Sequence, residues 1–351
     1  IKTVDIAFSQ LPLNRVSPAD MTLNAGYGNS ADRAVLMAAM LKAVGLIPQF
    51  MLTSSLSSLK SLQGPLAAFP SADWFVSVLV CVETPLGRVT LGDTDQYAAL
   101  GTVVSFGNPA LNLTSGEIET IKAAGPRFED AIELDLTIDL SPTGDAVLTQ
   151  HQSHYGIGYD LFCKDYLEMT PEERRRRFQD IVSSVSRSAV ALSPYQVNCE
   201  SYPATDDFSV SVPGYATRQG DLLTLELPVI IRTISGVSGT QRSNPLLRDT
   251  YAKQSMKIEI LLPEGVKSIE ASPPEFRHLE LPGAGEVKIA TRVLKPQTEK
   301  GADRRMRIIV EQFSDSRPSL VLPEKYPGLL GLQRSIANPG LRTIVVRLGK
   351  D

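Results

Sequence analysis

Histidine is scarce in this sequence. The chain has three histidines among 351 residues, at positions 151, 154 and 278. No imidazole therefore precedes residue 151, although imidazole is the commonest base in enzymes that use a serine or cysteine nucleophile. We expect each histidine to be a surface residue or a hydrogen-bonded structural one. His151 and His154 lie three apart on a predicted strand, so their side chains should face opposite sides of the sheet.

Cysteine is equally rare, and its spacing matches no metal site. Cys81, Cys163 and Cys199 form no CxxC pair. The sequence therefore predicts neither a zinc site nor a disulfide framework, and we expect no metal and no cofactor. Cys81 lies among the valines of a predicted strand, where a thiol is expected to be buried and unreactive.

Long apolar runs and strong charge are also missing. No run reaches the roughly 18 apolar residues that span a bilayer, so we expect no membrane-spanning segment. The net charge of -4 gives no electrostatic reason to expect nucleic acid as a partner. The chain begins at Ile1 without methionine and already in a strand-like segment. We therefore expect an upstream domain of the same protein, which would also hold any export signal.

The patterns that are present predict an α+β protein of three domains. Residues 1–115 combine a helix near 30–44, closed by Gly45, with strands near 50–53, 74–83 and 88–92. This is a helix packed on an antiparallel sheet. Residues 115–126 are predicted to be a connector because their charges and Gly-Pro end interrupt the pattern.

The middle and last domains are predicted to span residues 127–250 and 251–351, although the patterns leave open whether they are one domain or two. The middle domain should hold a hairpin of 132–140 and 146–155, two helices near 159–168 and 171–189, and strands near 196–202, 208–213 and 222–229. Thr170 and Pro171 are typical of a helix start. Residues 172–177 are expected to be a solvated helix face rather than an anion-binding patch. The last domain is predicted to be sandwich-like, with strands near 256–262, 286–293, 304–312 and 342–348 and a helix near 326–337.

The stretch GYGNSADRAVLMAAMLKAVG, residues 26–45, places Ser30 at the head of a nearly apolar helix. Backbone N–H groups and the positive end of the dipole at such a position would stabilise an oxyanion beside a nucleophile. Serine is also among the best N-cap residues. Local sequence favours the capping role over the nucleophilic role.

The same stretch resembles the core motif of bacterial transglutaminase-like proteins, in which Gly-x-Cys-x-Asp precedes an apolar helix that ends in glycine. Further matches are Ile1-Lys-Thr-Val before the motif, Trp74-Phe-Val where the family has Asn-His-Val, and Leu91-Gly-Asp-Thr-Asp-Gln-Tyr-Ala where it has Leu-Asp-x-Thr-Asp-x-Tyr-Ala. The resemblance covers residues 1 to about 105. It implies a papain-like fold with a Cys-His-Asp triad, followed by the β-rich extension that many exported bacterial relatives carry.

The residues of this chain depart from that triad at every position. Ser30 stands where the family has cysteine, Phe75 where it has histidine and Gly92 where it has aspartate. Asp93 is adjacent, but in a regular strand its side chain would point to the other face. Trp74 and Phe75 could form an aromatic ligand platform in the vacated cleft, although core packing is the favoured role of Phe75.

These observations predict a catalytically inactive transglutaminase-like protein with a binding or structural role at the bacterial cell envelope. From the resemblance we expect a periplasmic or cell-surface location and a protein, peptide or glycan ligand. One alternative is an active hydrolase or peptidase in which Ser30 uses His151 or His154 as a remote base. Another is a protein-interaction scaffold that acts through its β-rich C-terminal part.

Overall fold

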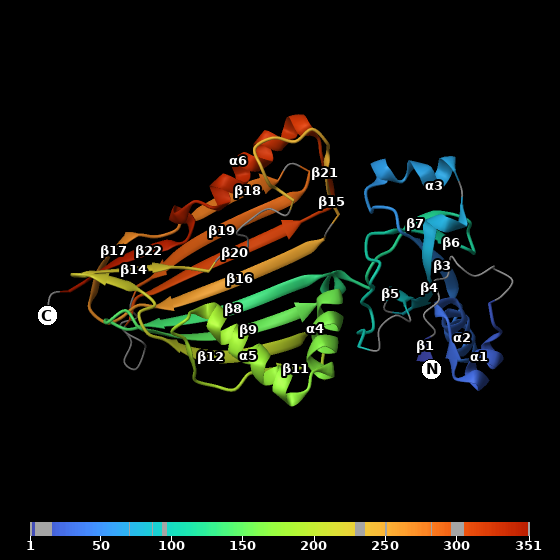
Figure 1. Ribbon diagram of the computed structural model, residues 1–351, viewed down its shortest axis with the longest axis horizontal. Helices are drawn as coiled ribbons and strands as arrows, with labels where there is room; N and C mark the ends of the chain where they lie inside the picture. The colour runs from blue at the N-terminus through green and yellow to red at the C-terminus, as the bar shows by residue number, and fades with distance from the viewer. Residues whose placement is uncertain are drawn as a thin grey trace. The chain divides into compact units, whose positions relative to one another are not determined.

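The computed structural model describes residues 2–3, 16–69, 71–85, 87–92, 97–228, 236–249, 251–281, 283–295 and 305–349 (Figure 1). The chain divides into two compact units. The N-terminal unit consists of Ile1–Asp130 and Tyr155–Lys164, and the C-terminal unit of Ala131–His154 and Asp165–Asp351. Helices and strands are mixed in both, as the predicted α+β class requires.

The N-terminal unit is built on a five-stranded sheet with the strand order β5-β4-β3-β6-β7. Its strands are β3 (Gln49–Ser54), β4 (Phe75–Thr84), β5 (Gly87–Leu91), β6 (Pro109–Asn112) and β7 (Ile118–Thr120), all paired antiparallel. Its helices are α1 (Ala19–Ala25), α2 (Ser30–Ala43), α3 (Gly64–Ala68) and the first part of α4 (Ile157–Glu168), and β1 (Lys2–Thr3) pairs with β2 (Tyr27–Gly28).

Helix α2 covers one face of this sheet. Its small residues Ala31, Ala34 and Ala38 pack against Val78 and Val80 of β4. Small side chains let the helix approach closely, which explains why this helix is rich in alanine. The predicted helix and its closing glycine are confirmed, since Gly45 has φ +85°. A second apolar cluster fills the opposite face, with Met51, Leu79, Cys81, Val103, Ala110 and Ile121.

The N-terminal unit extends beyond the predicted boundary at residue 115. Strand β7 lies inside the predicted connector and pairs with β6, with Leu111 opposite Ile118. Ile121 is buried in the same unit. The sequence pattern missed β7 because a three-residue edge strand is too short to show periodicity.

The C-terminal unit contains a nine-stranded sheet. The order is β10-β12-β9-β8-β16-β20-β19-β18, with β11 also paired to β12. The strands are β8 (Ala131–Leu140), β9 (Ala146–Tyr155), β10 (Val190–Ala191), β11 (Gln196–Asn198), β12 (Ala204–Val212), β16 (Ala252–Leu261), β18 (Phe276–Leu281), β19 (Gly285–Leu294) and β20 (Arg307–Ser316). The predicted hairpin of β8 and β9 is confirmed.

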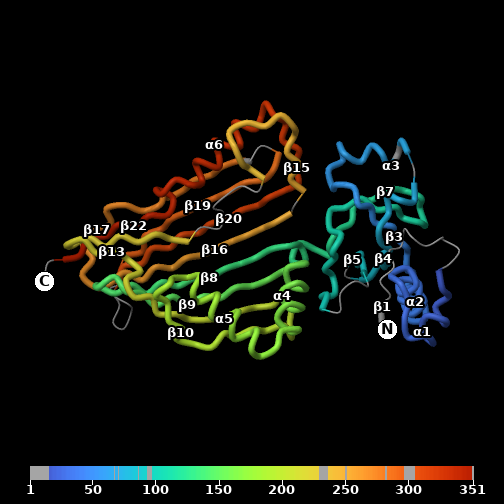
Figure 2. Tube along the Cα trace, viewed as in Figure 1, coloured from blue at the N-terminus to red at the C-terminus, as the bar shows by residue number. Residues whose placement is uncertain are grey.

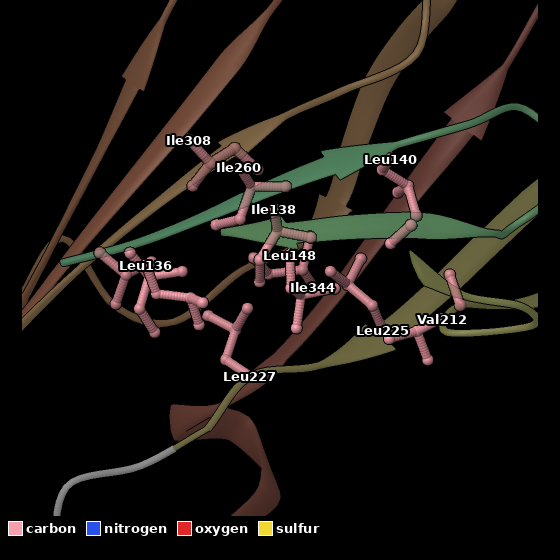
Figure 3. Close-up of a cluster of buried hydrophobic side chains, with 14 of the residues drawn as sticks. Leu136, Ile138, Leu140, Leu148, Val212, Leu225, Leu227, Ile260, Ile308 and Ile344 are labelled. Atoms are coloured by element: carbon pink, nitrogen blue, oxygen red, sulfur yellow. The ribbon is translucent and has the colours of Figure 1, made fainter. Parts of the chain in front are cut away.

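A four-stranded sheet of order β13-β14-β22-β17 packs on one face of the larger sheet. Its strands are β13 (Thr217–Gln219), β14 (Leu222–Glu226), β17 (Val266–Ala271) and β22 (Thr343–Leu348). Leu225 and Ile344 from this layer meet Ile138, Ile260 and Ile308 from the larger sheet in one apolar cluster (Figure 3). This two-layer packing has the sandwich character predicted for the last domain, but it involves both predicted domains.

The predicted division at residue 250 therefore differs from the structure. Strand β8 lies beside β16 (Figure 2) and pairs with it in parallel. In this register Leu136 is opposite Ile258. A domain boundary at 250 would cut this shared sheet and its core. The pairing joins segments more than a hundred residues apart, and no local pattern in either segment indicates the partner.

Two helices and a strand pair complete the C-terminal unit. Helix α5 (Pro171–Val185) packs through Val182 on the main core, and α6 (Tyr326–Ile336) packs through Tyr326, Leu329 and Ile336 on a second cluster that includes Leu279 and Val287. Strand β15 (Leu246–Arg248) pairs with β21 (Ser319–Val321). The predicted cap of α5 is confirmed, because the Thr170 side chain accepts a hydrogen bond from the Glu173 N–H.

The cysteines differ from the prediction. Cys163 and Cys199 are disulfide-bonded, whereas Cys81 is a free, buried thiol. The sequence contained no regular spacing from which this linkage could be read. Bringing two cysteines together depends on the tertiary path of the chain, which is why cysteine spacing predicted no disulfide.

Candidate functional site

The start of α2 is built by a capping box in which Asn29, not Ser30, is the N-cap. The Asn29 Oδ1 accepts a hydrogen bond from the Asp32 N–H at 2.9 Å, and Asp32 Oδ2 accepts one from the Asn29 N–H at 3.1 Å. Ser30 is the first residue of the helix. The expectation that Ser30 caps the helix is therefore wrong, because asparagine one position earlier is an equally good cap and its side chain reaches the same N–H groups.

The other motif residues also have structural roles. Asp32 is buried, and its Oδ1 accepts a hydrogen bond at 2.6 Å from the backbone N–H of Ser17. A Cβ atom at Gly28 would lie 2.9 Å from side-chain atoms of both Thr22 and Asp32. Only glycine allows so close an approach. The Gly-x-Ser-x-Asp pattern therefore holds the loop before α2 against the helix.

Ser30 has no imidazole in its own unit. It is partly buried, and the sequence of the N-terminal unit contains no histidine. All three histidines belong to the C-terminal unit. A serine hydroxyl needs a neighbouring base to be a nucleophile at neutral pH, and no residue of the N-terminal unit can supply an imidazole for that role.

Each histidine contacts a carboxylate. His151 Nδ1 lies 2.6 Å from Asp207 Oδ1, His154 Nε2 lies 2.8 Å from Asp206 Oδ2, and His278 Nε2 lies 2.9 Å from Glu286 Oε2. The prediction that positions 151 and 154 face opposite sides of the sheet is confirmed, since His151 is exposed and His154 is buried.

His151 has a second neighbour that the sequence analysis missed. Its Nε2 lies 3.5 Å from the hydroxyl of Ser153, two residues along β9, while Asp207 stands directly opposite His151 on β12. Serine, imidazole and carboxylate thus follow one another in the order of a hydrolase triad. Ser153 is only 8% exposed, however, so its hydroxyl is poorly accessible. Only the cross-strand register brings Asp207 to this place.

The other positions implied by the family resemblance are spread along the sheet. Phe75 is the partly buried first residue of β4. Gly92 follows Leu91, which pairs with Val80, so position 92 falls four residues further along β4 than Phe75, about 13 Å away along the strand. Asp93 lies outside the described residues. Trp74 belongs to a 3₁₀ turn before β4, where its indole N–H donates to the Phe69 carbonyl at 2.8 Å.

A cavity of about 670 Å³ lies on the other face of the sheet from α2. Neither Trp74 nor Phe75 lines it. Its lining residues include Lys60, Cys81, Arg88, Thr90, Glu119 and Lys122. Three cationic residues and one carboxylate thus line the cavity. No sequence motif indicates this site, because its lining residues come from five separate segments of the chain.

The charges at the base of the cavity are ordered by hydrogen bonds. Arg88 Nη1 donates to Glu119 Oε2 at 2.6 Å, and Asn112 Nδ2 donates to Glu119 Oε1 at 2.8 Å. The hydrogen bond from Asn112 is the largest effect that lowers the pKa of Glu119, ahead of Arg88, although burial opposes it. Burial acts to lower the pKa of Arg88, but Glu119 and Cys81 outweigh it and the pKa is raised.

Cys81 is held at the wall of this cavity. Its Sγ lies 3.2 Å from the hydroxyl of Thr90, and the residue is 2% exposed. The predicted buried thiol is therefore confirmed.

Among the described residues, no cluster of three or more histidine, cysteine, aspartate or glutamate side chains could hold a metal ion. The described helices include none that is long and apolar enough to cross a membrane.

Comparison with known proteins identifies no family. No family model matches this chain, and no curated protein matches it. One similar solved structure is the crystal structure of a protein titled a "putative protease" from Parabacteroides distasonis, with 14% sequence identity and a TM-score of 0.48. The alignment covers 94% of this chain and 46% of that protein. This chain thus spans about half the length of that protein.

Proposed function

We propose that this protein acts by binding a ligand, and that its N-terminal unit is a transglutaminase-like domain without the catalytic triad. The observation that carries the proposal is the absence of histidine from the sequence of the N-terminal unit. A transglutaminase or protease of this class moves a proton through an imidazole beside its nucleophile. Ser30 has no such neighbour available within its unit.

The remaining chemistry of the N-terminal unit suits binding. Lys60, Arg88 and Lys122 line the cavity with a single carboxylate, Glu119, which Arg88 and Asn112 already engage. Concave sites with a few placed polar groups are where small ligands and peptide ends bind. The surplus of positive charge favours a ligand that carries a carboxylate or another acidic group.

The disulfide supports a location outside the cytoplasm. Cys163 and Cys199 are disulfide-bonded. Structural disulfides form and persist in oxidising compartments such as the periplasm and the cell surface. We therefore propose an exported protein of the cell envelope, as the family resemblance implies.

The test is a comparison of turnover between the wild type and Ser30→Ala. Both are incubated with amide, amine and peptide substrates, and ammonia release and peptide cleavage are measured. We expect the two proteins to give the same background rate. A rate that depends on the Ser30 hydroxyl would contradict the proposal.

Binding is tested with a fluorescent oligoglutamate peptide and its oligoglutamine counterpart. Fluorescence anisotropy should show that the acidic peptide binds more tightly, and that the double variant Lys60→Gln, Lys122→Gln weakens it about tenfold. Lys42→Gln, an exposed change on α2, is the control. Equal binding of both peptides, or no effect of the double variant, would exclude an acidic ligand in this cavity.

A second candidate function follows from the contacts of His151. The order Ser153, His151, Asp207 favours a serine hydrolase centred on Ser153 rather than on Ser30. In such a reaction the Ser153 hydroxyl would attack an acyl carbon and pass its proton to His151 Nε2, while Asp207 would stabilise the imidazolium.

A fluorophosphonate probe separates the two candidates. Labelling of Ser153 that His151→Ala abolishes and Ser209→Ala preserves would establish the hydrolase. Ser209 is a suitable control because it lies on the same strand pair, opposite Thr149 and two residues along the register from His151, and its hydroxyl is 3.0 Å from that of Thr149. We expect no labelling at either Ser30 or Ser153, because the first lacks a base and the second is buried.

A further inference from the structure

Arg248 is a buried charge in the C-terminal unit. It ends β15, which pairs with β21 so that Arg248 stands opposite Ser319. The residue is 6% exposed. Leu246 and Val321, on the same face of this strand pair, belong to the apolar cluster beneath α6. The side chain of Arg248 is therefore directed toward the protein interior.

The guanidinium of Arg248 is largely unpaired. Its Nη2 donates a hydrogen bond to Ser316 Oγ at 2.9 Å, but Nε and Nη1 are buried and have no hydrogen-bond partner among the described residues. The hydroxyl of Ser319, on the paired strand, is also buried without a partner there. The neighbouring carboxylate of Asp315 is bonded to Arg317 instead, at 2.6 Å.

Such an arrangement is costly as it stands. Buried cations in proteins are normally paired with an anion. Moving an unpaired charge out of water costs more free energy than burying any other kind of group. Burial lowers the pKa of Arg248. A guanidinium nevertheless remains protonated at neutral pH, so Arg248 cannot escape the cost by losing its proton.

We infer that Arg248, Ser316 and Ser319 form a buried site for one small inorganic anion, such as chloride or a small oxoanion. Every free group at this place can donate a hydrogen bond: the Nε and Nη1 of the guanidinium, the Ser319 hydroxyl, and the Ser316 hydroxyl, whose oxygen already accepts from Arg248. A ligand that only accepts hydrogen bonds and carries negative charge satisfies all of them. The site is separate from the cavity in the N-terminal unit and does not depend on the proposed function.

The first test is the thermal stability of the whole chain as a function of anion concentration. The protein is transferred to a buffer whose anion is bulky, and chloride, bicarbonate, sulfate or phosphate is then added at constant ionic strength. We expect at least one of these anions to raise the Tm of the wild type saturably, by about 5 °C at roughly 100 times its Kd. Arg248→Met should abolish the rise, and it should unfold no lower than the wild type in the bulky-anion buffer.

Arg334→Met is the matched control, since Arg334 is an exposed arginine of α6. It should keep the full anion dependence. A wild type whose Tm responds to the anions no more than that of Arg248→Met would overturn the inference.

A second measurement decides the question if Arg248→Met does not fold. Crystals of the wild type grown in bromide should show an anomalous difference peak within hydrogen-bond distance of the Arg248 guanidinium. The absence of a peak there, or an ordered water alone, would overturn the site.

Discussion

The N-terminal and C-terminal units differ in where they hold their chemical groups. The N-terminal unit has a helix start that resembles a nucleophile position, and a cationic cavity on the opposite face of its sheet. The C-terminal unit has all three imidazoles, each beside a carboxylate. Proton-transfer groups and the candidate nucleophile at Ser30 are thus assigned to different units. A motif that resembles a nucleophile site is therefore evidence of catalysis only when the base and the carboxylate that the nucleophile needs lie beside it.

The two units also differ in their cores. The C-terminal unit has a large apolar cluster that runs through both layers of its sandwich and a smaller one beneath α6, whereas the N-terminal unit has two small clusters, one on each face of its sheet. A continuous core ties many strands to one cooperative unit. We therefore expect the C-terminal unit to unfold as a whole and the N-terminal unit to be the less stable of the two.

The largest effect is expected from Gly285→Ala in the C-terminal unit. Gly285 has φ +119°, and a Cβ there would lie 1.8 Å from the backbone oxygen of Asp315 on the paired strand. The change should reduce the free energy of unfolding by about 3 kcal/mol or more, since both backbones must shift. Denaturant unfolding measured on both units should show the loss in the C-terminal transition only.

Gly283→Ala is the control for that change. Gly283 also has a positive φ, of +66°, but a Cβ there meets no atom within 4 Å. Its cost should be about 1 kcal/mol, the strain of the backbone alone. Equal losses in the two variants would show that the contact with Asp315 is not the cause.

An intermediate effect is expected at the start of α2 in the N-terminal unit. Asn29→Ala removes the side chain that caps the helix and should cost about 1 kcal/mol. Ser30→Ala should change the free energy of unfolding by less than about 0.5 kcal/mol, because Ser30 is not the cap. The measurement is unfolding in urea, in which the transition of the N-terminal unit is monitored. A larger loss for Ser30→Ala would restore the capping role that the sequence predicted.

A small, pH-dependent effect is expected from the cavity charge Glu119. Because the pKa of folded Glu119 is below its ordinary value of 4.5, its ionised form stabilises the fold above that pH, and this contribution is lost as the pH falls through the folded pKa. Glu119→Gln should therefore cost about 0.5 kcal/mol near neutral pH and less near pH 3.

The check is the difference in unfolding free energy between wild type and variant across that range. Glu117→Gln serves as control, since Glu117 is an exposed neighbour on the approach to β7. If the difference in unfolding free energy stays constant on acidification, the hydrogen bonds of Glu119 do not stabilise its ionised form.

Local sequence signals predicted several elements well. The predicted helices beginning at residues 30 and 171 and the predicted hairpin of residues 132–155 are confirmed within a few residues. Caps, glycine at a helix end and alternating apolar residues act over short distances, so the sequence carries them directly. Ser30 shows the limit of such signals, because two adjacent residues were both good caps.

The candidate sites were much less predictable. Ser30, Phe75 and Gly92 were chosen from a resemblance, and no contact among them could be read from the sequence. The cationic cavity, the pairing of His151 with Asp207 and the unpaired guanidinium of Arg248 all depend on strands meeting side by side. Strand register and partner choice are long-range properties, which short patterns do not encode.

The sequence by itself determined several helices and strands, the mixed α+β character and the absence of any imidazole before residue 151, because these depend on residue types and short periods. Only the tertiary structure decided that residues on both sides of position 250 share one sheet, and which side chains each histidine and arginine meets. Those outcomes depend on burying apolar surface between strands distant along the chain, and the core that achieves this exists only once the chain has folded.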